Sequence, residues 1–80
     1  MKNNAHINAT LEAVLGVMDA RAYVNIFRQL KDGKEELLRS NKIYNIISDQ
    51  EFFGAYNVCE AKVIGLSVTF GAVNILIEEA

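Results

Sequence analysis

The sequence predicts a small α+β domain, and three observations point to this class. Apolar residues near the N-terminus repeat at helical spacing, an Asp-Gly turn signal separates two strand-like segments, and Val63–Ile77 runs fifteen residues without a charge. Eighty residues are too few for two cores and near the size at which one core alone is marginal, and a hydrophobic share of 51% argues against disorder. We therefore expect residues 1–80 to form a single domain with an N-terminal helix, a β-hairpin, a short second helix and a C-terminal antiparallel strand pair. The first seven residues are expected to be flexible.

The first predicted element is an amphipathic helix. The apolar residues that share one face of it are Ile7, Leu11, Val14, Leu15 and Met18. Asn8 or Thr10 can cap its N-terminus, because a short polar side chain satisfies the free N–H groups of a first turn. We expect this helix to end near Asp19.

The next segment, residues 20–31, allows two interpretations. Tyr23–Phe27 is rich in β-branched and aromatic residues, and Asp32-Gly33 is a hairpin turn signal, so the first interpretation is a strand pair completed by Glu35–Arg39. In the second, the helical stripe continues and Gly33 ends one long helix. The second stripe consists of Met18, Ala22, Ile26 and Leu30. We predict the strand pair because of its β-branched and aromatic content.

The second half of the chain predicts a short helix and two strands. Ser40 or Asn41 can cap a helix that reaches about Asp49, with core-facing residues Ile43, Ile46 and Ile47. We then expect a strand at Val58–Ile64 and a reversal at Gly65-Leu66. In the closing run the apolar alternation slips by one residue at Gly71-Ala72, which predicts a β-bulge there.

Four segments of the chain match a pattern found elsewhere: Leu11–Leu15, Ala22–Ile26, Lys31–Glu35 and Asn74–Glu78. In these segments the sequence resembles small uncharacterised proteins from phages and prophages of Gram-positive bacteria. The long uncharged run departs from that pattern, in which a shorter closing strand is expected. The resemblance implies an accessory protein of a mobile element, located in the cytoplasm of the bacterial host, and it assigns no functional residue.

Few residues offer catalytic or metal-binding chemistry. The chain has one histidine, His6, and one cysteine, Cys59, far apart in sequence, so neither a nucleophile–base pair nor a metal cluster is predicted. Cys59 is expected to be a buried apolar residue. We expect no enzyme activity and no cofactor. We also expect no membrane span, because the uncharged run is shorter than the ~20 residues that a spanning helix needs.

Two groups of residues are candidates for binding. The first is an aromatic turn with acidic neighbours, expected to bind a host protein: Tyr44, Asp49, Glu51, Phe52, Phe53 and Tyr56. The second is a basic hairpin that would bind an anionic ligand or nucleic acid, an alternative we do not favour: Arg28, Lys31, Lys34, Arg39 and Lys42. Acidic residues interleave with the basic ones, which weakens the second candidate.

The sequence thus predicts a non-catalytic binding protein. The expected role is a phage-encoded inhibitor that occludes a host protein such as a nuclease or an anti-phage defence complex. The alternative is a homo-oligomer that binds an anionic ligand or nucleic acid through the basic hairpin. In either case we expect self-association, most simply a dimer, through the C-terminal strands, whose outward face carries no charge.

Overall fold

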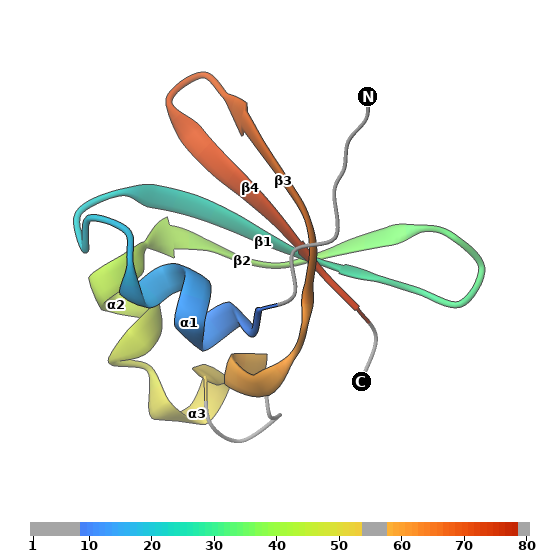
Figure 1. Ribbon diagram of the computed structural model, residues 1–80, viewed down its shortest axis with the longest axis horizontal. Helices are drawn as coiled ribbons and strands as arrows, with labels where there is room; N and C mark the ends of the chain where they lie inside the picture. The colour runs from blue at the N-terminus through green and yellow to red at the C-terminus, as the bar shows by residue number, and fades with distance from the viewer. Residues whose placement is uncertain (1–8, 54–57, 79–80) are drawn as a thin grey trace.

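The computed structural model describes residues 9–53 and 58–78, and it confirms the predicted α+β class (Figure 1). In chain order the elements are α1 (Leu11–Gly16), β1 (Tyr23–Gln29), β2 (Glu35–Lys42), α2 (Ile43–Ile47), α3 (Gln50–Phe53), the 3-10 turn η1 (Val58–Glu60), β3 (Val63–Thr69) and β4 (Ala72–Ile77). The expected flexibility of the first seven residues concerns a segment outside the described residues.

Helix α1 is shorter than the sequence predicts. Thr10 caps it, since its hydroxyl accepts a hydrogen bond from the Ala13 N–H at 3.2 Å. The helix ends at Gly16 rather than near Asp19, where the chain instead turns towards β1. The Arg21 backbone N–H donates to the Asp19 carboxylate, and this bond, together with the Arg21 guanidinium, holds the pKa of that carboxyl below its usual range.

Residues 20–31 contain strand β1, so the strand-pair prediction is confirmed and the long-helix alternative is wrong. Strands β1 and β2 pair antiparallel, with Gln29 opposite Glu35 at the last pair before the turn. Gly33 adopts the left-handed φ of 88° that this turn requires, and the Asp32 carboxylate accepts a hydrogen bond from the Lys34 N–H.

Helix α2 packs through two of its three isoleucines. Ile43 and Ile46 are buried, whereas Ile47 is 38% exposed, so its predicted core position is wrong. A five-residue helix turns only one narrow face to the core. The N-cap position is Lys42, and the Asn41 side chain accepts hydrogen bonds from the Lys42 N–H and the Asn45 amide instead.

The C-terminal strands differ from the prediction in where they turn. The strand begins at Val63 rather than Val58, and the reversal lies at Phe70-Gly71 rather than at Gly65-Leu66. The change of phase that predicted a bulge at Gly71-Ala72 is therefore the hairpin turn itself. Its two residues have φ values of 52° and 81°, as a type I′ turn requires. An irregularity in the pairing does occur, but between Val63 and Gly65.

The sheet has the order β2-β1-β4-β3, and its central pair, β1 and β4, is parallel. Because β1 and β4 run in the same direction, the tips of the two hairpins point to opposite ends of the sheet (Figure 1). The helices lie on one face. The buried core on that side consists of Leu11, Leu15, Val24, Ile26, Ile43, Ile46, Phe53, Val58, Val63, Ile75 and Ile77. No helix in the described part of the chain is long and apolar enough to cross a membrane.

Candidate binding face of the sheet

The face of the sheet opposite the helices, here called the open face, presents three rows of side chains. The strand registers place one residue of each strand in each row. In the order β2-β1-β4-β3, the rows are Lys42, Tyr23, Ala72 and Thr69; then Ser40, Asn25, Asn74 and Ser67; then Leu37, Phe27, Leu76 and Gly65. The middle row is thus polar, the third row is apolar, and the first row is mixed, with Tyr23 and Ala72 between two polar end residues.

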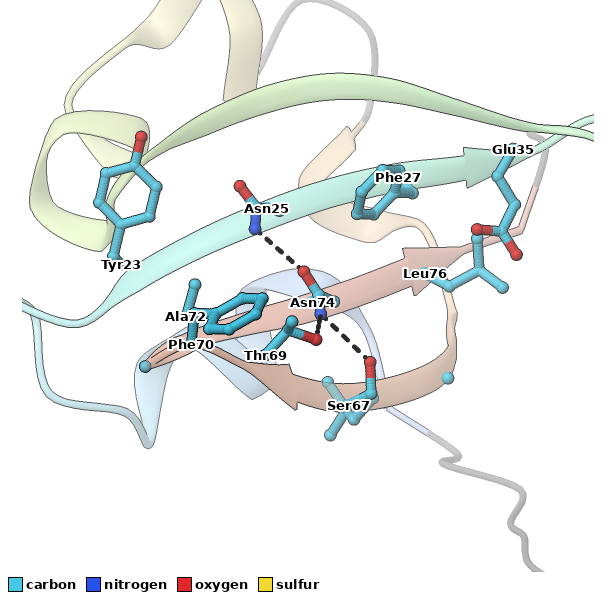
Figure 2. A pocket seen from close by; sticks show the side chains of 13 residues that line it. Tyr23, Asn25, Phe27, Glu35, Ser67, Thr69, Phe70, Ala72, Asn74 and Leu76 are labelled. Carbon is cyan, nitrogen blue, oxygen red and sulfur yellow. Dashed lines mark hydrogen bonds between the residues drawn. The ribbon is translucent and has the colours of Figure 1, made fainter.

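The middle row is a hydrogen-bonded ladder that crosses all four strands. The Ser40 hydroxyl donates to the side-chain Oδ1 of Asn25 at 2.5 Å, and the side-chain amide of Asn25 donates to Oδ1 of Asn74 at 2.9 Å. The Asn74 amide donates in turn to Ser67 at 3.3 Å and to Thr69 at 2.9 Å (Figure 2). These bonds fix the amide orientations, so the ladder presents a preorganised polar line at the centre of the face.

A hollow of about 770 Å³ lies on this face above β1, β4 and β3. Its aromatic lining comes from both ends of the sheet: Tyr23 and Phe70 at one end and Phe27 at the other (Figure 2). Gly65 has no side chain to fill the third row, and its neighbour Leu76 forms the floor there. The result is a shallow site with aromatic ends and a polar centre.

Phe70 is the most exposed apolar residue of the described chain. Its side chain is fully exposed at the β3–β4 turn, and Tyr23, in the adjacent row, is 44% exposed. Phe70 also has a φ of 52°, in the left-handed region that a bulky residue rarely occupies. Packing does not account for a large apolar side chain in this conformation, because no described residue covers the ring.

The open face carries almost no net charge. Its charged strand residues are Lys42 and Glu35, which have opposite signs and lie at opposite ends of β2. The Lys42 ammonium lies 6.0 Å from the centre of the Tyr44 ring, so this lysine leans towards α2 rather than over the hollow. The face therefore suits an uncharged ligand surface better than a polyanion.

The structure divides the predicted aromatic turn among several environments. Phe53 is 7% exposed and belongs to the core, so its ring is not available to a partner of the folded chain. Phe52 is half-buried, and the guanidinium carbon of Arg39 lies 4.5 Å from the centre of its ring. Asp49 accepts a hydrogen bond from the same arginine.

The remaining residues of the predicted aromatic turn do not form one site with Asp49, Phe52 and Phe53. Tyr44 is 47% exposed and Glu51 is exposed, whereas Tyr56 lies outside the described residues. The exposed aromatic that remains, Tyr44, lies on α2 beside Lys42, next to the Tyr23 end of the open face.

The predicted basic hairpin is not a single patch. Arg28 and Arg39 lie on the helix-covered face of the sheet. There Arg28 forms an ion pair with Glu36, and Arg39 forms one with Asp49. The other three basic residues lie elsewhere, two at the hairpin turn and one on the open face: Lys31, Lys34 and Lys42.

The described residues bring together no group for metal binding. Across residues 9–53 and 58–78, no three His, Cys, Asp or Glu side chains lie close enough to hold an ion. Cys59 is a partly buried free thiol in η1, packed against the core rather than in a strand. His6 lies outside the described residues.

Sequence reasoning did not identify the open face as one site. A signal was present: Tyr23, Asn25 and Phe27 alternate along one strand, with the buried Val24 and Ile26 between them. The alternation alone does not show that β4 lies beside β1, because the two strands are 49 residues apart at Asn25 and Asn74. Comparison with family models, curated proteins and solved structures gave no match to this chain.

Proposed function

We propose that this chain is a non-catalytic binding domain that recognises a protein partner through the open face of its sheet. The observation that carries the proposal is the fully exposed Phe70, held at the rim of a hollow that is preorganised by the Asn25–Asn74 ladder. Exposed aromatic anchors beside well-ordered polar groups are typical of protein-binding hot spots.

The charge of the face favours a protein over a nucleic acid. Single-strand binders combine stacking aromatics with a positively charged groove, and they bind more weakly as salt rises. Here the net charge of the chain is −2, and on the open face Lys42 is offset by Glu35. A partner with an uncharged, largely apolar ridge complements the hollow better.

The biological role we propose is inhibition of a host protein by occlusion. The resemblance to phage and prophage proteins supports this role, because a small accessory protein can block a host enzyme with a rigid face and no chemistry of its own. A nuclease or a defence complex remains the proposed class of target.

The test is the affinity for a partner isolated from bacterial lysate, measured by calorimetry with purified components. Phe70→Asn removes the ring while keeping a residue that accepts a left-handed turn position. We expect this change to weaken binding by about 2 kcal/mol, or roughly 30-fold, as truncation of a hot spot does.

The matched control is Val17→Asn. Val17 is 86% exposed and follows α1, on the opposite side of the sheet, so this variant also removes an exposed apolar side chain. Its affinity should equal that of the wild type. Equal losses in both variants, or no loss in Phe70→Asn, would contradict the proposal. Tight, steeply salt-dependent binding of a single-stranded oligonucleotide, lost in Lys31→Glu with Lys34→Glu, would favour the nucleic-acid alternative instead.

A further inference from the structure

We infer that strand β3 pairs antiparallel with β3 of a second copy of this chain, which makes a continuous eight-stranded sheet about a two-fold axis near Ser67. β3 is the last strand in the order β2-β1-β4-β3. Among the described residues, Ala9 and Thr10 border its start, beside Lys62 and Val63, and no described strand lies beyond Gly65–Thr69.

The two edges of the sheet differ in how they are protected. β2 carries charged residues along its length, namely Glu35, Glu36, Arg39 and Lys42. Charges on an edge strand discourage pairing with another chain. β3, in contrast, has no charged residue from Val63 to Thr69 and no proline. It also exposes aliphatic side chains, with Leu66 at 47% and Val68 at 71%. Of the two edges, as residues 9–53 and 58–78 form them, the uncharged one is therefore better suited to pairing.

Within the described residues, the outer side of β3 from Gly65 to Thr69 has no backbone partner. Thr69 and Ala72 flank the two-residue turn at Phe70-Gly71, and the two residues that flank such a turn form a hydrogen-bonded pair. In an antiparallel strand, both the N–H and the C=O of one residue point to the same side, and those of the next residue point to the other side. The outward groups are consequently those of Leu66 and Val68.

The sequence of this segment matches itself when it is reversed. An antiparallel pairing centred on Ser67 places Leu66 opposite Val68 of the partner, twice, and Gly65 opposite Thr69. Two exposed aliphatic residues therefore meet on the helix-covered side, and small residues meet on the other. A two-fold interface requires such self-complementarity. The irregular pairing between Val63 and Gly65 lies outside this regular stretch.

The polar ladder of the open face also supports this register. Ser67 is its outermost member and accepts a hydrogen bond from the Asn74 amide at 3.3 Å, which leaves the Ser67 hydroxyl hydrogen free to donate. In the pairing centred on Ser67, this hydroxyl faces its counterpart in the second copy. The ladder then continues across the axis, and the two open faces merge into one.

The test is the mass in solution by analytical ultracentrifugation from low to high micromolar concentration. We expect the wild type to rise from 8.9 kDa towards twice that mass, since a five-residue pairing is smaller than a standard interface. Val68→Lys should raise the dimer dissociation constant by about tenfold or more, because it places a lysine opposite the partner's apolar residue. Leu37→Lys, an equivalent change on β2, should leave it unchanged.

A disulfide test reports the register. In a Cys59→Ser background, Ser67→Cys should crosslink two chains faster than Thr69→Cys, because residue 67 faces its own counterpart at the axis. A monomer at every concentration would overturn the inference, as would protection of the Leu66 and Val68 amides in that monomer, which would show that the chain covers this edge itself. Loss of the dimer in Leu37→Lys but not in Val68→Lys, or equal crosslinking by both cysteines, would also overturn it.

Discussion

Phe70 adopts a backbone conformation that a bulky residue does not favour, because its φ is positive. A left-handed φ costs an L-residue with a bulky side chain roughly 1–2 kcal/mol. Its exposed ring gains nothing from the core in return. Strained residues of this kind cluster at functional sites, where binding rather than folding explains them. The strain at Phe70 therefore supports the open face as the proposed binding site, independently of the hollow.

We expect Phe70→Asn to raise the free energy of unfolding by about 1 kcal/mol, because asparagine tolerates the left-handed region. Urea denaturation followed by circular dichroism measures this change. Phe70→Val is the control, since a β-branched residue fits the turn no better than phenylalanine. A stability that falls on introducing asparagine would mean that the ring contributes to folding.

At the scale of the elements, the helices depend on the core rather than on their own length. The helices α1, α2 and α3 contain six, five and four residues, and helices this short are unstable in isolation. Each is held by buried side chains, such as Leu11 and Leu15 in α1. In α3 that role belongs to Phe53, which explains why this ring is not part of a partner-binding surface.

We expect Phe53→Ala to lower the free energy of unfolding by about 3–5 kcal/mol, the usual cost of removing a buried aromatic ring. The matched control is Tyr44→Ala, on the exposed side of α2, which should change stability by less than about 1 kcal/mol. Thermal or urea unfolding measures both. Similar small effects in the two variants would show that Phe53 is not a core residue.

At the scale of the whole molecule, the parallel pair β1–β4 joins the two halves of the chain. Each hairpin is local, but the pairing of Val24–Arg28 with Val73–Ile77 brings together residues 49 apart in sequence. The two central strands also contribute four buried side chains to the core: Val24, Ile26, Ile75 and Ile77. Cooperative stability should therefore be concentrated at this junction.

We expect the amides of the β1–β4 junction to exchange most slowly with deuterated solvent. Those amides open only in global unfolding, whereas the edge strands β2 and β3 open locally. Hydrogen exchange measured by NMR at low micromolar concentration gives these exchange rates. At that concentration the chain is expected to be monomeric, so association through β3 does not protect the β3 amides. If the edge-strand amides are the slowest, the two hairpins do not unfold as one unit.

The sequence by itself determined the elements that local chemistry controls. Asp32-Gly33 specified a hairpin turn, Asn8 or Thr10 indicated a helix start, and the β-branched and aromatic content of Tyr23–Phe27 decided between strand and helix. The end of α1 and the position of the last turn were predicted less well. The apolar residues after Val63 alternate in the same way whether the chain contains a β-bulge or a hairpin turn. Their phase alone therefore did not place the hairpin turn at Phe70-Gly71.

Only the tertiary structure decided which residues share the candidate site. The rows of the open face exist because β4 lies parallel to β1, and no local pattern encodes that pairing. Tertiary packing likewise placed Phe53 in the core, away from the aromatic turn surface that the sequence predicted, and paired the half-exposed Asp49 with Arg39. Side-chain periodicity assigns a residue to a face of its own element, but what covers that face depends on contacts distant in the chain.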